Sequence, residues 1–117
     1  MNKIIFNWVL LILYMFFIFY FSSFDKIFIV EKSPNFYLKD KLLHVLEYSI
    51  LGFLTYNTFR QHEFLNKKIF FYSIMFATIY GITDELHQLF VFNREFSIFD
   101  IIADYLGSSL VLIKKLL

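Results

Sequence analysis

The chain has 117 residues, of which 59% are hydrophobic and 23% aromatic, and its formal net charge is +1. A soluble domain of this size contains fewer apolar residues, so the composition predicts a membrane protein. The charge gives no reason to expect a nucleic-acid partner. The chain contains no cysteine, which excludes disulfides, thiolate metal sites and a cysteine nucleophile.

The first predicted element is an uncharged run at residues 4–24, which is longer than the roughly 20 residues needed to cross a bilayer core. A cleaved signal peptide is the competing interpretation, but the run is too long for one and lacks a small-residue cleavage site. Three further apolar segments follow at about residues 38–59, 69–92 and 96–113. The sequence therefore predicts an all-α fold, a bundle of four transmembrane helices that forms a single domain over residues 1–117.

The three later segments differ from the first because they carry ionisable side chains. Such helices insert only when their polar groups face the protein interior instead of lipid. The second carries Lys41, His44 and Glu47, the third carries Asp84, Glu85 and His87, and the fourth carries Asp100 and Asp104.

Basic residues in the short loops predict the orientation. One side of the bundle holds Lys3, Arg60, Lys67, Lys68, Lys114 and Lys115, and the other holds Lys26, Lys32, Lys39 and Arg94, with Lys41 at its boundary. Both termini are therefore expected in the cytoplasm. The second and fourth helices then start at the outer face and the third ends there. At 1.5 Å per residue, their ionisable groups fall within about 12 Å of that face.

Helical phase predicts that these groups meet. Ala77, Gly81, Asp84 and Gln88 follow one another along a single face of the third segment. Small residues on such a face let membrane helices approach closely. The fourth segment repeats the pattern with Asp100, Ala103, Asp104 and Gly107, and the second offers Lys41, Tyr48 and Gly52 with His44 beside them.

These residues resemble the VanZ-like family of small bacterial membrane proteins. The resemblance is carried by Asp40-Lys41-Leu42-Leu43-His44 with Glu47-Tyr48, by Thr83-Asp84-Glu85-Leu86-His87-Gln88, and by Arg94 with Phe96-Ser97-Ile98-Phe99-Asp100 and Gly107. It implies a multi-pass protein of the bacterial cytoplasmic membrane, associated with resistance to teicoplanin-type glycopeptide antibiotics. Two positions depart from the family pattern: Asp104 stands where asparagine is frequent, and Phe92-Asn93 replaces a Pro-Gly turn.

We therefore expect an outward-facing polar site between the second, third and fourth helices. It would bind or modify an envelope component or an amphiphilic, glycopeptide-type antibiotic. The candidate catalytic residues are His44, Glu47, Asp84, Glu85 and Asp100. The candidate binding residues are Lys41, Tyr48, His87, Gln88, Arg94 and Asp104, of which Lys41, Gln88 and Arg94 are expected to position an anionic group.

Other interpretations of the same residues remain open. A membrane-embedded hydrolase or phosphatase would use a histidine and a carboxylate to activate water against a lipid-linked substrate. A structural protein would use the acids only as interhelical pairs. His44-x-x-Glu47 and Asp84-x-x-His87 each place two ligands on one helix face, as in divalent metal sites of helical bundles, although this spacing is not diagnostic of one metal. The sequence assigns no cofactor and no partner beyond the lipid bilayer and an amphiphilic or lipid-linked ligand.

Overall fold

The computed structural model describes residues 2–23, 36–91 and 96–116, and this part of the chain is helical, without a strand. Its α-helices are α1 (Lys3–Ser22), α3 (Phe36–Phe59), α4 (Ile69–Gln88) and α5 (Ile98–Ser109). A 3₁₀ segment, η1 (Glu63–Lys68), connects α3 to α4, and a second, η2 (Leu110–Leu116), continues α5. The prediction of an all-helical fold is confirmed.

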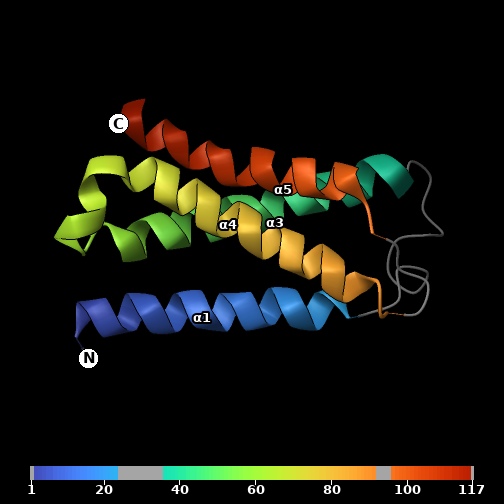
Figure 1. Ribbon diagram of the computed structural model, residues 1–117, viewed down its shortest axis with the longest axis horizontal. Coiled ribbons are helices and arrows are strands. Elements are labelled where there is room, and N and C mark those ends of the chain that lie inside the picture. Colours follow the sequence, from blue (N-terminus) through green and yellow to red (C-terminus); the bar gives the residue numbers. More distant parts are fainter. Residues whose placement is uncertain (1, 24–35, 92–95, 117) are drawn as a thin grey trace.

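The helices lie side by side in one elongated bundle (Figure 1). α1 packs against α3 and α4, and α5 packs against α3 and α4 from the other side (Figure 1). The beginning of α1, the segment η1 and the end of η2 lie at one end of the bundle, whereas α3 and α5 both begin at the opposite end. Consecutive helices therefore alternate in direction, as the sequence predicted.

The helix ends have local causes. The side chain of Asn2 caps α1 by accepting a hydrogen bond from the backbone N–H of Ile4 at 2.7 Å, and Ser97 caps α5 by accepting from the N–H of Asp100 at 3.3 Å. At the end of α4, the N–H groups of Phe90 and Val91 bond to carbonyls three residues earlier, at 3.0 and 3.1 Å. These tighter bonds end the α-helix at Gln88, four residues before the predicted boundary.

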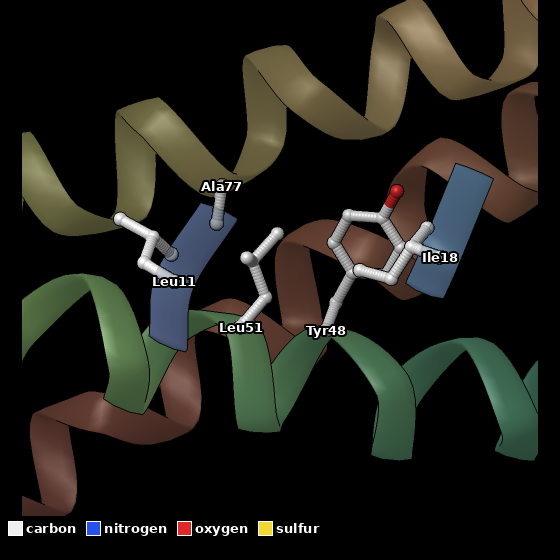
Figure 2. Packing of buried hydrophobic residues seen from close by; sticks show 5 residues of the cluster. All are labelled: Leu11, Ile18, Tyr48, Leu51 and Ala77. Atoms are coloured by element: carbon white, nitrogen blue, oxygen red, sulfur yellow. The ribbon is translucent and has the colours of Figure 1, made fainter. Parts of the chain in front are cut away.

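A small apolar core joins α1, α3 and α4. Figure 2 shows Tyr48 and Leu51 projecting from α3 toward α4, which carries Ala77, with Leu11 and Ile18 of α1 beside them. All five side chains are fully buried. Because buried apolar side chains stabilise by roughly 1.5–3 kcal/mol each, this cluster fixes α1 against the other helices.

α3 and α5 approach each other at backbone distance through two glycines. A Cβ atom on Gly52 would lie 2.8 Å from the carbonyl oxygen of Ser108, and a Cβ on Gly107 would overlap the carbonyl oxygen of Val45. Small residues allow this spacing, and any side chain at either position would push the helices apart. The contact holds the first turns of α5 beside the first turns of α3, which carry the polar residues.

The distribution of polarity is inverted relative to a soluble protein. Among the described residues, twelve polar or charged residues are buried against eight apolar ones, while large apolar side chains cover the outside of every helix. Within the described residues, two helices, Lys3–Ser22 and Leu65–Gln88, are long and apolar enough to cross a membrane. An exterior of this kind requires an apolar environment or a partner, because continuous apolar surface is unfavourable in water.

Candidate functional site

The polar residues of three helices converge in one layer, which we call the acidic layer. α3 and α5 contribute their first turns and α4 contributes its last turns, so the layer lies in the half of the bundle away from the termini. Its buried members are Asp40, His44, Tyr48, Asp84, Glu85, Gln88, Asp100 and Asp104, and the half-buried Lys41 borders it. The predicted convergence of three helices is therefore present in the structure.

Lys41 joins α3 to α5 at one side of the acidic layer. Its ammonium group contacts Oδ1 of Asp100 and lies 3.2 Å from Oδ2 of Asp40. The side chain of Asp100 is fully buried and that of Lys41 is 18% exposed. Removing one member of such a pair would leave a buried charge uncompensated, so these contacts are required wherever Asp100 is ionised.

His44 makes the second connection between α3 and α5. Its Nδ1 lies 2.8 Å from Oδ1 of Asp104, and its Nε2 lies 3.6 Å from Oδ2 of Asp100. Asp100 and Asp104 are four residues apart on α5 and therefore share one helix face. The imidazole is held between them, so its position and orientation are fixed by two carboxylates.

α4 closes the layer through three contacts. The hydroxyl of Tyr48 donates to Oδ2 of Asp84 at 3.4 Å, and the backbone N–H of Ser97 donates to Oε2 of Glu85 at 3.1 Å. Asp104 packs over Gly81, where a Cβ would lie 2.7 Å from the Asp104 Oδ2 atom. The absence of a side chain at Gly81 thus creates the space that the Asp104 carboxylate fills.

Several buried polar atoms in the layer lack a hydrogen bond. Within the described part of the chain, Oε1 of Glu85, Oδ2 of Asp104 and both amide atoms of Gln88 have no hydrogen-bond partner. All three side chains are fully buried. Leaving such a group unsatisfied costs roughly 1–3 kcal/mol. Proteins retain unsatisfied groups of this kind mainly where a ligand, ion or water completes them.

Two of the predicted site residues contact α1. Glu47 is half-buried, and its backbone carbonyl accepts a hydrogen bond from the Tyr14 hydroxyl at 2.8 Å. His87 stacks on Phe19 of α1 at a centroid distance of 4.1 Å, and its Nε2 lies 2.9 Å from Oγ of Ser23. Arg94 lies outside the described residues.

Two participants were not selected from the sequence. Asp40 contacts Lys41, and Ser97 binds Glu85 through its backbone. Asp40 lies four residues before His44, so helical spacing would have placed it on the same face. The contact of Ser97 depends on a backbone group and left no signal in the sequence.

Two groups of potential metal ligands lie in the acidic layer. The first group consists of Asp40, His44 and Asp100, and the second of His44, Glu85 and Asp104. Within each group, one potential ligand atom of each residue lies within 4.8 Å of those of the other two. Neither group is one of the i, i+3 pairs suggested by the sequence, because each combines residues from different helices.

Comparison with known protein families gives one match. The family model described as VanZ/LLP1 matches residues 6–114, which is nearly the whole chain. No curated protein and no solved structure matches the chain significantly.

Proposed function

Because the chain belongs to the VanZ/LLP1 family, we propose that it is a multi-pass protein of the bacterial cytoplasmic membrane that binds an amphiphilic ligand of the cell envelope in its acidic layer. The family supports an envelope protein associated with glycopeptide resistance in general. The proposal of a ligand site rests on the buried acidic layer, which three helices form inside an apolar exterior. Buried ionisable groups at such a place mark functional sites more often than packing contacts.

The dimensions of the helices support four membrane spans. α3 has 24 residues and a length of about 36 Å at 1.5 Å per residue. α5 alone is short, with 12 residues, but the 7 residues of η2 continue it to a total of about 32 Å. Both lengths match a hydrocarbon core of about 30 Å.

Charge supports cytoplasmic termini. Six basic residues of the described chain lie at or near the end of the bundle that holds the termini and η1: Lys3, Arg60, Lys67, Lys68, Lys114 and Lys115. Lys3, Arg60 and Lys114 also line a polar pocket there. On the positive-inside rule this end faces the cytoplasm and the acidic layer faces outward. Reporters fused after Lys32 and after Arg94 should then report the outer side, and a cytoplasmic signal would refute the topology.

The charge of the layer indicates which ligand group it binds. The described layer contains five buried carboxylates and two basic side chains, and Lys41 already contacts two of the acids. Away from Lys41, an anionic group would therefore meet repulsion. We propose that the part of the ligand entering the layer is cationic or donates hydrogen bonds, whereas its apolar part remains against the outer faces of the helices.

Susceptibility of cells to a glycopeptide antibiotic tests this function. Cells that express the chain are compared with cells that express Asp84→Asn, which removes a buried carboxylate charge while keeping its shape. Glu63→Gln is the matched control, because Glu63 is an exposed acid in η1 at the other end of the bundle. We expect Asp84→Asn alone to lose protection at unchanged membrane level. Equal protection by both variants would refute a role of the layer in ligand binding. Loss of the Asp84→Asn protein from the membrane would indicate that the acid stabilises the fold and would also count against the proposal.

Hydrolysis of a lipid-linked substrate is the second candidate function. The contact between His44 and Asp104 favours it, since a carboxylate that orients a histidine is the usual arrangement for a general base. Release of phosphate from a lipid-linked phosphate by the purified protein, and its loss in His44→Gln, would support this candidate.

A further inference from the structure

We propose that His44, Glu85 and Asp104 bind one divalent transition-metal ion, of the Zn²⁺ or Mn²⁺ class. Each residue comes from a different helix, α3, α4 and α5 respectively, and one ligand atom of each lies within 4.8 Å of the other two. All three side chains are buried. A metal ion there would connect the three helices that form the acidic layer.

The unsatisfied carboxylate oxygens point to a ligand in this position. Glu85 is anchored through Oε2 by the N–H of Ser97 at 3.1 Å, whereas Nδ1 of His44 and Oδ1 of Asp104 lie 2.8 Å apart, a separation at which both could bind one ion in place of their hydrogen bond. Their second oxygens, Oε1 of Glu85 and Oδ2 of Asp104, are buried and have no hydrogen-bond partner within the described residues. Carboxylates oriented by one oxygen and available through the other are typical of metal ligands.

Charge distinguishes this group from its neighbour. The potential ligand atoms of the neighbouring group, Asp40, His44 and Asp100, also lie within 4.8 Å of one another. The Lys41 ammonium, however, contacts the carboxylates of both Asp40 and Asp100. A metal ion there would be repelled by the lysine. Two carboxylates and a neutral imidazole carry two negative charges, which one divalent cation balances. Neutralisation of this kind matters most where burial makes an uncompensated charge expensive.

The donor atoms indicate the class of metal. One imidazole nitrogen with carboxylate oxygens suits Zn²⁺, Mn²⁺ or Fe²⁺, whereas Ca²⁺ prefers six or more oxygens and thiolate-seeking ions need cysteine. Gln88 supplies an additional oxygen donor on the same face of α4, three residues after Glu85. Its amide is fully buried and has no hydrogen-bond partner within the described chain.

This inference goes beyond the proposed function, because the ion would bind whether or not an envelope ligand is recognised. The test uses the full chain, purified in lipid nanodiscs with its affinity tag removed. Metal content is measured by mass spectrometry before and after treatment with a chelator. Thermal unfolding of the stripped protein is then followed with added Zn²⁺, Mn²⁺ or Mg²⁺. We expect about one equivalent of a transition metal per chain and a rise in melting temperature when it is restored.

Variants locate the ion. Glu85→Gln and Asp104→Asn should each weaken metal binding by more than about 100-fold, since even the loss of an outer-shell partner costs about 10- to 100-fold. Glu63→Gln and Asp40→Asn should keep the ion. Loss in Asp40→Asn and retention in Glu85→Gln would place the ion in the lysine-bridged group and overturn the assignment. The wild-type protein tests the proposal even if a variant fails to fold. Wild-type protein that contains no metal and whose melting temperature does not rise on adding metal would overturn the proposal.

Metal binding and the proposed function fail separately. Wild-type protein that binds metal but gives no protection against antibiotic retains this inference and refutes the function. Protein that protects cells but binds no metal would refute this inference and leave the proposed function standing.

Discussion

Substitution of Gly52 by alanine tests the close approach of α3 and α5. The new Cβ would lie 2.8 Å from the carbonyl oxygen of Ser108 and 3.0 Å from its Cα. Ordinary contact for such pairs begins near 3.4 Å. These are backbone atoms of a helix and cannot rotate away, so α3 and α5 must separate by roughly 0.6 Å, as overpacked cores do.

The net effect is a balance of two opposing terms. Alanine gains about 1 kcal/mol over glycine inside a helix, whereas overpacking typically costs about 1–3 kcal/mol and more where only backbone can move. We expect a net destabilisation of about 1–2 kcal/mol, because the separation also stretches the contacts of Lys41 and His44 to α5. For a chain of this size, that loss lowers the melting temperature by roughly 3 to 10 °C.

Thermal unfolding in lipid nanodiscs measures this change. Thr83→Ala is the control, because Thr83 is exposed and its hydroxyl donates to the carbonyl of Tyr80 in the same helix, α4. Its melting temperature should stay within about 2 °C of wild type. A Gly52→Ala protein that melts at or above the wild-type temperature would mean that the two helices do not approach at backbone distance, and the geometry of the acidic layer would have to be reconsidered.

Three further predictions concern contacts that hold the bundle. Ser97→Ala removes the side-chain cap of α5 and should cost about 1 kcal/mol, while Ser97→Asn, which keeps a capping oxygen without adding a charge beside Glu85 and Asp100, should not; equal losses would exclude capping as the cause. His44→Phe leaves Asp100 and Asp104 without the imidazole and should lower stability by about 3 kcal/mol, whereas a neutral effect would show that the carboxylates do not depend on it. Trp8→Phe removes the bond from Nε1 to His62 at the other end of the bundle and should cost about 1 kcal/mol in thermal unfolding without changing metal content; a change in metal content would contradict the separation of the two ends.

The sequence predicted the helical fold and the convergence of polar residues because both follow from helix periodicity. Asp84, Gln88, Asp100 and Asp104 are buried because they share faces with small residues, and that pattern is visible without a structure. The family was also identified correctly from motif order and spacing.

The pairing within the acidic layer could not be predicted in the same way. His87 lies three residues after Asp84, and spacing alone placed it in the same site, yet it stacks on Phe19. α4 has α1 on one side and α5 on the other, so two of its faces are interior and periodicity cannot separate them. Likewise, the pairing of Lys41 with Asp100 depends on how far α5 lies from α3, which the glycine contacts determine.

The difference between the glycine contact of α3 with α5 and the attachment of α1 has a consequence for motion. α3 and α5 meet along their backbones and through buried charges, so separating them would break several close contacts at once. α1 is held through side chains, namely Leu11 and Ile18 in the apolar core and hydrogen bonds such as those from Tyr14 to Glu47 and from Thr58 to Asn7. We therefore expect local opening to begin at α1, so that the side of the bundle covered by this helix becomes accessible first.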